Sequence, residues 1–330
     1  MRHALAALVL AAASAPLQAG STPVPVGPEF QVNTYTFTAQ GTPAIATDAG
    51  GDFVVVWQSL GSSGRDTFAS DSLQGQRYSA LGAPQGAEFQ VNSYTTSVQI
   101  NAAIAAAAGD FVVVWESFGS SGGDTSGSGI QSQRYSASGA PQGAQFQVNS
   151  YTPGQQRFPA IAADADGDFV VVWDGSGSSG GDIDDSVQGR RFRVTGDLQG
   201  TVFLDRNSDG IHDASEPGVA GIAIELYDLA LELHRTAVTD ANGDYVLKPK
   251  EGLWNARFVP PASGGFTFTA EDVGGDDEVD SDADPQTGWT NLFQMTIGLF
   301  DDTLDAGILP DIFADGFESG GSAAWSATVP

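Results

Sequence analysis

The sequence predicts an all-β protein in which three propeller-blade-like four-stranded repeats precede a β-sandwich. One observation is a pentapeptide that recurs at Glu29–Asn33, Glu88–Asn92 and Gln145–Asn149, in steps of 59 and then 57 residues. Another is that short β-rich segments alternate with turns of Gly, Ser, Asp and Pro, while no stretch has a persuasive 3.6-residue apolar period. Sheets are therefore expected throughout the chain.

The chain opens with the layout of a secretory signal peptide. Arg2 and His3 precede an apolar run over Ala4–Ala13, and Leu17–Ala19 ends in a small residue. We expect residues 1–19 to be removed and the mature protein to be secreted, either free or associated with the cell surface. The apolar run is shorter than the roughly 20 residues that cross a bilayer, so no membrane-spanning segment is expected.

Charge and cysteine content narrow the classes of partner. With 41 acidic and 13 basic residues the formal net charge is −28, which disfavours nucleic acid and anionic membranes and favours cations. The chain has no cysteine. An exported protein without disulfides depends on apolar cores, ladder hydrogen bonds and bound ions for stability.

Residues 20–196 are predicted to form the repeat domain, with copies at about 29–87, 88–144 and 145–196. Each copy contains the run Asp-Phe-Val-Val-Val-Trp, which is apolar on both faces, as in a sheet that lies between two others. Four strands in a period of this size fit a propeller blade. The copies resemble the tandem Gly-Asp-Phe-Val-Val-Val-Trp repeats of secreted bacterial surface proteins, which are similar to propeller blades.

Three copies are fewer than the four to eight blades of closed propellers. A β-trefoil or a prism is the alternative, but strands in a trefoil usually bury one face, whereas these runs are apolar on both. An open array of three sheets would leave two apolar faces, so we expect self-association or packing of the second domain against them.

Two sets of repeated side chains suggest roles. The tryptophans end apolar strands and are expected in the core rather than on a sugar-binding platform; they are Trp57, Trp115 and Trp173. The arginines are expected to pair with repeated carboxylates; they are Arg77, Arg134 and Arg191, with Asp52, Asp110 and Asp168 as partners. The Gly/Ser-rich loops at 61–71, 119–129 and 177–185 are expected to be solvated connections, with calcium binding as the alternative.

Residues 205–216 have the spacing of an EF-hand calcium loop. Side-chain oxygens are expected from Asp205, Asn207 and Asp209, a carbonyl from Ile211, a direct or water-mediated contact from Asp213 and a bidentate carboxylate from Glu216. Gly210 permits the sharp bend. The flanking segments alternate like strands, so bound Ca²⁺ is expected to lock a β-structure rather than to open a helix pair.

The remainder of residues 197–310 predicts a β-sandwich of seven or eight strands. An Asn-Gly turn at Ala241–Gly243 is expected to join two strands in a hairpin. The expected strands are Gly200–Leu204, Ile222–Leu226, Thr236–Thr239, Asp244–Lys248, Trp254–Val259, Phe266–Thr269, Leu292–Ile297 and Leu304–Ile308.

The order of these motifs over 197–308 resembles the B domain of SD-repeat surface adhesins. That resemblance implies a prealbumin-like sandwich, rigidified by calcium, that serves as a stalk or spacer. It also favours weaker calcium sites at two further acidic segments, where turn chemistry and a solvated acidic loop are the alternatives. The residues concerned are Asp240, Asn242 and Asp244, and Asp277, Asp280 and Asp282.

An enzyme is disfavoured, because cysteine is absent and His212 and His234 lie in no nucleophile motif. We expect a calcium-binding structural or adhesion protein whose partner is an extracellular protein or a glycan. A lectin-like carbohydrate-binding module is the alternative, and an extracellular glycoside hydrolase is a remote one, since two carboxylates suffice for that chemistry. Residues 311–330 are expected to form a C-terminal tail.

Overall fold

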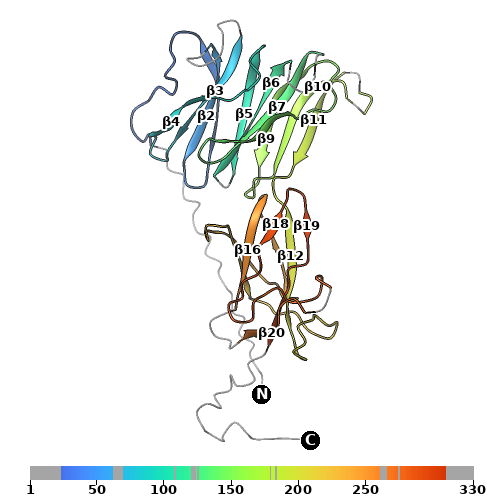
Figure 1. Cartoon of the computed structure of the whole chain (residues 1–330). Helices are drawn as coiled ribbons and strands as arrows, with labels where there is room; N and C mark the ends of the chain where they lie inside the picture. Colours follow the sequence, from blue (N-terminus) through green and yellow to red (C-terminus); the bar gives the residue numbers. More distant parts are fainter. Residues whose placement is uncertain are drawn as a thin grey trace, which may run out of the picture.

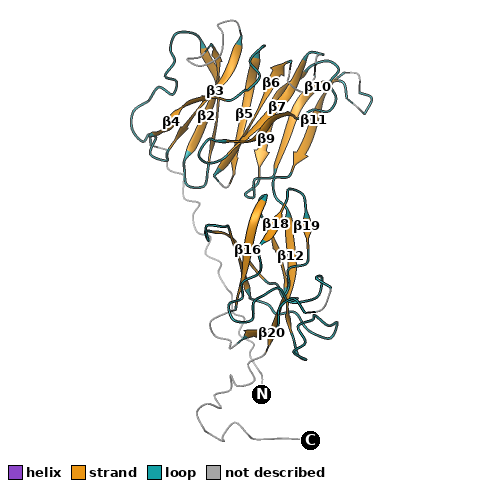
Figure 2. Ribbon diagram, in the orientation of Figure 1, coloured by secondary structure: helices purple, strands orange, loops and turns teal. Residues whose placement is uncertain are grey.

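A computed structural model describes residues 24–61, 70–107, 109–119, 124, 126–178, 180–182, 184–260, 266–273 and 276–309. These residues form strands and connections without a helix, so the all-β prediction is confirmed (Figure 2). Three sheets form the first half of the chain and two form the second, arranged end to end (Figure 1). The predicted signal peptide and C-terminal tail lie outside the described residues.

The first half consists of three antiparallel meanders, here called the first, second and third repeat sheets. The first contains β1 (Gln40–Thr47), β2 (Phe53–Leu60), β3 (Asp71–Tyr78) and β4 (Pro84–Gln90). The second contains β5 (Gln99–Ala107), β6 (Asp110–Phe118), β7 (Ser128–Tyr135) and β8 (Pro141–Gln147). The third contains β9 (Gln156–Ala163), β10 (Phe169–Ser176) and β11 (Asp185–Phe192). Each fourth strand carries the Phe-Gln of the next sequence copy, so a sheet spans the boundary between two copies.

The second repeat sheet is covered on both faces. Val113 and Trp115 pack against the first sheet, whereas Val112 and Val114 pack against the third. The double-sided burial expected from the apolar run is therefore present in β6. Stacked antiparallel sheets fit the predicted open array, while the likeness of the sheets to propeller blades stays a prediction.

The three repeated tryptophans lie in the core, as predicted, and are not available as sugar platforms. Each indole N–H donates a hydrogen bond to a glutamine side chain from the neighbouring strand at 2.8–2.9 Å, which satisfies its single donor inside the sheet stack. The pairs are Trp57–Gln40, Trp115–Gln99 and Trp173–Gln156.

The expected pairing of the repeated arginines with repeated carboxylates is wrong: no such ion pair joins them in the described ranges. Arg77 instead donates to the carbonyls of Gln85 and Ala137. Asp52 accepts from the backbone N–H of Ala80 and from Gln85, so turn and strand donors already occupy its oxygens. The carboxylate closes a turn rather than neutralising an arginine.

The second half is a sandwich of two sheets, in agreement with the predicted architecture. One sheet has the order β15–β12–β20–β17, with β19 also beside β12, and the other has the order β14–β13–β16–β18. Their inner faces share one apolar core that includes Leu198, Ile224 and Phe258. The strands are β12 (Asp197–Leu204), β13 (Ala223–Tyr227), β14 (Leu233–Val238), β15 (Asp244–Leu247), β16 (Gly252–Val259), β17 (Thr267–Phe268), β18 (Phe293–Met295), β19 (Phe300–Asp301) and β20 (Ala306–Leu309).

The hairpin predicted at Ala241–Gly243 is wrong, because β14 and β15 belong to different sheets. The tight turn itself is present: Gly243 N–H donates to the Asp240 carbonyl, and Asp240 N–H donates to the Asp244 carbonyl. The chain therefore crosses from one layer of the sandwich to the other at this turn.

Both lysines of the chain lie at the junction between the halves. Lys250 Nζ lies 2.6 Å from the Asp110 carboxylate of the second repeat sheet, and Lys248 lies 3.8 Å from Asp166 of the third. Arg235 also pairs with Asp166. The sandwich therefore contacts the ends of the repeat sheets and does not cover their apolar faces (Figure 1).

Substitution of Gly218 by alanine tests the packing of the layer-crossing turn. A Cβ atom at this position would lie 1.5 Å from the Asn242 carbonyl oxygen and 2.2 Å from its carbon, so backbone must move. We expect a loss of about 3 kcal/mol in the free energy of unfolding, measured by urea denaturation. Gly221→Ala is the control for a glycine with open space around its Cβ, although its positive φ adds a smaller strain. Equal stability of Gly218→Ala and wild type would contradict this packing.

Candidate metal centre

The predicted calcium loop begins at Asp205, directly after β12. Its carboxylate is fully buried and accepts hydrogen bonds from Ser208 N–H at 2.6 Å, Gly210 N–H at 2.9 Å and Thr269 Oγ1 at 2.6 Å. Burial alone would raise the pKa of Asp205, but these hydrogen bonds outweigh it and lower the pKa. The first expected ligand is thus held as a carboxylate.

The other expected ligands gather around the same loop. Glu216 is buried and accepts from Arg206 N–H at 2.6 Å and Asp213 N–H at 3.2 Å, which ties the end of the loop to its beginning. The Asn207 amide donates to Asp209 at 2.9 Å and to Asp213 at 3.1 Å. Asn207 therefore contacts two of the other expected ligands and Glu216 closes the loop, but no three carboxylates of the described loop lie within 4.8 Å of one another.

The loop packs against the acidic segment that the sequence marked as a separate, weaker site. Ile211 and Asp280 form an isolated antiparallel bridge, and His212 N–H donates to the Val279 carbonyl at 2.7 Å. Ser281 N–H donates to Gly210 across the same contact. The two predicted sites are thus neighbours at the end of the sandwich remote from the repeat sheets (Figure 1).

Within this segment, one carboxylate oxygen from each of Asp277, Asp280 and Asp282 lies within 4.8 Å of the others. Asp280 is buried, and its Oδ1 has no hydrogen-bond partner among the described residues. A buried carboxylate oxygen without a donor is costly unless a cation or a proton compensates it. Carboxylates are ligands that Ca²⁺ prefers, so these residues fit a hard divalent cation.

Asp305, which precedes β20, joins this cluster and was not among the predicted ligands. Its backbone N–H donates to Asp282 Oδ2 at 2.7 Å, and its own Oδ1 accepts from Thr201 N–H at 2.5 Å. Its place beside Asp282, 23 residues away in the chain, is set by the pairing of β20 with β12. The resemblance over 197–308 includes this position, but no spacing in the sequence marked Asp305 as a ligand.

Three of these acids, Asp280, Asp282 and Asp305, have pKa values raised above the ordinary value of an aspartate. Burial, followed by the charges of Asp277, Asp280 and Asp305, raises the pKa of Asp282 to about 8. Burial, partly offset by the Thr201 hydrogen bond, raises the pKa of Asp305 to about 7. Burial and the charges of neighbouring carboxylates also raise the pKa of Asp280. Ionising this cluster is unfavourable unless positive charge enters it.

The remaining weaker candidates do not join the cluster. Asp240 Oδ1 accepts from the backbone N–H groups of Asn242 and Asp244, so it stabilises the layer-crossing turn, while Asp244 accepts from Thr201 Oγ1. In the repeat loops, Asp124 is buried and accepts from Ser126 and Gln147. No carboxylate cluster forms in the described parts of these loops.

The raised pKa values predict that stability without metal falls as pH rises from 5 to 8. Over this range the unfolded state ionises Asp282 and Asp305 while the folded state retains their protons, and a tenfold difference in proton affinity between the two states corresponds to about 1.4 kcal/mol. Thermal unfolding in EDTA should show a lower melting temperature at pH 8 than at pH 5. Asp282→Asn should flatten this dependence; a wild-type melting temperature that rises toward pH 8 would contradict it.

Comparisons with known proteins also single out the second half of the chain. Residues 196–308 match the family model described as the SdrD B-like domain. A 101-residue stretch is 37% identical to serine-aspartate repeat-containing protein F of Staphylococcus epidermidis, covering 30% of this chain and 6% of that protein. An 89-residue stretch is 43% identical to serine-aspartate repeat-containing protein C of Staphylococcus aureus (strain Newman), covering 26% of this chain and 9% of that protein.

These matches span less than a tenth of the length of each relative. Among solved structures, the Bacillus anthracis TIE protein aligns over 79% of this chain and 44% of its own, with 10% identity and a TM-score of 0.24, which is too low to inform the fold. The resemblance of residues 197–308 to an SD-repeat B domain is therefore confirmed, whereas the resemblance of the repeats to propeller blades stays a prediction.

Proposed function

We propose that the protein is a secreted or cell-surface calcium-binding structural protein that acts in adhesion or as an extracellular scaffold. The observation that carries the proposal is the convergence of loop 205–216 with the buried Asp280 and Asp305 and the half-buried Asp282. Two acidic segments that are far apart in the sequence share one end of the sandwich, and the oxygen of Asp280 there has no partner in the described chain.

The chemistry of the ligands favours Ca²⁺. Asp277, Asp280 and Asp282 offer three carboxylates, and loop 205–216 offers side-chain and carbonyl oxygens, with no cysteine in the chain to attract softer metals. When bound, Ca²⁺ would supply positive charge that these carboxylates otherwise lack. Burial and the charges of neighbouring carboxylates raise the pKa values of Asp280 and Asp282, as expected before such neutralisation.

The place of the loop in the fold favours a structural role over a sensor role. Asp205 N–H donates to the Ile308 carbonyl of β20, and Thr269 beside β17 donates to the Asp205 carboxylate. An ion held here would connect the end of β12 to β20, β17 and the acidic segment. Strands rather than helices flank the loop, so binding would stiffen the sandwich instead of opening a groove.

Localisation and partner class follow from the sequence and the relatives. The predicted signal peptide places the protein outside the cytoplasm, and matched relatives carry the name serine-aspartate repeat-containing proteins. The described part of the chain has no helix long and apolar enough to cross a membrane. We propose a non-enzymatic role with an extracellular protein as partner; burial of the repeat tryptophans removes the strongest support for a glycan ligand.

Calorimetry and thermal unfolding of the full chain test the proposal. Ca²⁺ at about 100 times its Kd should stabilise the folded protein by about 2.7 kcal/mol. Glu216→Gln and Asp280→Asn should each weaken binding and remove most of that gain, because each deletes a buried ligand charge. Glu232→Gln, which neutralises an exposed acid elsewhere on the sandwich, is the matched control and should respond like wild type. No heat and no stabilisation in the wild-type chain would overturn the metal assignment.

A further inference from the structure

The third repeat sheet lacks the fourth strand that its two neighbours have. β4 and β8 pair with β3 and β7, but β11 is an edge strand in the part of the chain that the structure describes. The segment that follows β11 carries Gln199-Gly200 where the other copies have Gln85-Gly86 and Gln142-Gly143. It forms β12 of the sandwich instead, so the position beside β11 stays open.

A matching fourth strand exists at the other end of the repeat domain. Residues 25–33 align with β4 and β8 through the Phe-Gln-Val-Asn motif, yet they pair with no strand among the described residues. One backbone angle already matches the fourth strands: Gly27 has φ +80°, close to +77° at Gly86 and +71° at Gly143. The Asn33 amide donates to the Tyr35 carbonyl at 2.8 Å, as Asn92 and Asn149 donate to Tyr94 and Tyr151.

The first and second repeat sheets both show the hydrogen bonds that a fourth strand makes. In the first repeat sheet, Val91 N–H donates to the Leu73 carbonyl and Leu73 N–H donates to Asn92 Oδ1, both at 2.8 Å. The second sheet repeats both bonds at Ile130. The equivalent residue of β11 is Val187, which is 77% exposed, whereas Leu73 and Ile130 are fully buried.

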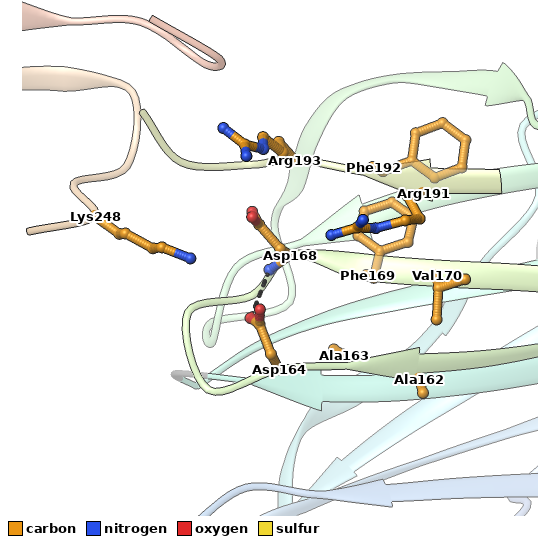
Figure 3. A pocket seen from close by; sticks show the side chains of 10 residues that line it. All are labelled: Ala162, Ala163, Asp164, Asp168, Phe169, Val170, Arg191, Phe192, Arg193 and Lys248. Atoms are coloured by element: carbon orange, nitrogen blue, oxygen red, sulfur yellow. Dashed lines mark hydrogen bonds between the residues drawn. The ribbon is translucent and has the colours of Figure 1, made fainter. Parts of the chain in front are cut away.

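The face of the third sheet is uncovered as well. Val170 and Val172 are 38% and 39% exposed, while their equivalents in the first two sheets are buried. Between the first and second sheets a hollow of about 60 Å³ remains, into which Phe111 and Ala137 of the second sheet project. On the third sheet the corresponding hollow is about 580 Å³, bordered by Phe169, Phe192 and Arg191 (Figure 3).

The first repeat sheet offers the complementary surface. Ile45 is 63% exposed, although its equivalents Ile104 and Ile161 pack in the junctions between sheets. The Phe30 ring contacts Tyr78 of the first sheet at a tilt of 55°, as Phe89 contacts Tyr135 of the next sheet at 53°, but Phe30 is 56% exposed. Phe53 and Ala80 are the counterparts of the Phe111 and Ala137 that fill the covered hollow.

Residues 25–33 do not occupy the open position beside β11 of the same copy. The Tyr78 hydroxyl donates to the Val32 carbonyl at 3.0 Å, so residues 29–33 are held on the first sheet. The second sheet lies between the first and the third (Figure 1). The occupant that fits both the open edge and the open face is therefore a second copy of this chain.

We propose that this protein assembles head to tail, with Pro25–Asn33 of one copy added as the fourth strand beside β11 of another. In that register Phe30 lies over Gly189, as Phe89 lies over Gly75, and Gln31 lies opposite Gln188, as Gln90 lies opposite Gln74. The contact is heterologous, so it grows until the copies close into a ring. Two chains supply six sheets, within the four to eight of closed propellers, and leave no repeat sheet with a free face.

Cysteine cross-linking tests the register, because the natural chain has no cysteine. Cα atoms of directly opposed residues in an antiparallel pair are about 4.5–5.5 Å apart, a separation that a disulfide can bridge. Chains carrying only Gln31→Cys, mixed with chains carrying only Gln188→Cys, should form a disulfide-linked heterodimer on mild oxidation. Gln31→Cys mixed with Val238→Cys, an exposed site on the sandwich, is the control. Cross-linking no better than the control would overturn the proposal.

Sedimentation equilibrium tests the apolar face independently. The wild-type chain should form dimers or larger closed species, and Val170→Lys together with Val172→Lys should weaken assembly at least about tenfold in Kd, a cost of about 1.4 kcal/mol. Both valines are partly exposed in the single chain, so the fold should survive, as circular dichroism would verify. Val238→Lys should leave assembly unchanged. A wild-type chain that stays monomeric, or assembly indifferent to the paired lysines, would contradict the proposal.

Discussion

The architecture depends on one constraint: an apolar sheet face must be covered by another layer. In the sandwich the two sheets cover each other, and one core satisfies both. In the repeat domain every sheet has two apolar faces, so each needs two neighbours. Only the second sheet has both, because three sheets in a row leave an outer face at each end. The exposed Val170 and Val172 follow from that count, whereas the free edge of β11 arises because the next segment forms β12 of the sandwich.

Electrostatic interactions constrain the sandwich, as the need to bury apolar faces constrains the repeat sheets. The turns at its far end bring the carboxylates of Asp277, Asp280 and Asp282 close together, where ionised carboxylates repel one another. The near end has the opposite character, since both lysines of this acidic chain pair there with carboxylates of the repeat sheets. One end of the sandwich thus attracts cations, and the other end holds the two halves of the chain together.

Sequence patterns predicted the features that depend on residues close together in the chain. The Phe53–Trp57 run and its second copy predicted strands buried on two faces, as β2 and β6 are. Calcium binding by Asp205–Glu216 stays a prediction. These patterns failed where the structure depends on which strands and side chains pair in three dimensions. Asn242-Gly243 specifies a tight turn but not which sheet each flanking strand joins. The sequence also does not show that a backbone N–H group donates to Asp52, a carboxylate expected to pair with an arginine. Asp305 reaches the acidic cluster only because β20 pairs with β12.

That pairing of β20 with β12 has a mechanical consequence. The strand by which the chain enters the sandwich and the strand by which it leaves are parallel neighbours, with Val202 beside Ala306 and Leu204 beside Ile308. A pull along the chain would therefore draw these strands in opposite directions, loading their hydrogen bonds in shear and all together instead of one after another. The links that hold Asp205 to β20 lie at the end of this ladder. This geometry is expected to resist extension of the sandwich along the chain axis.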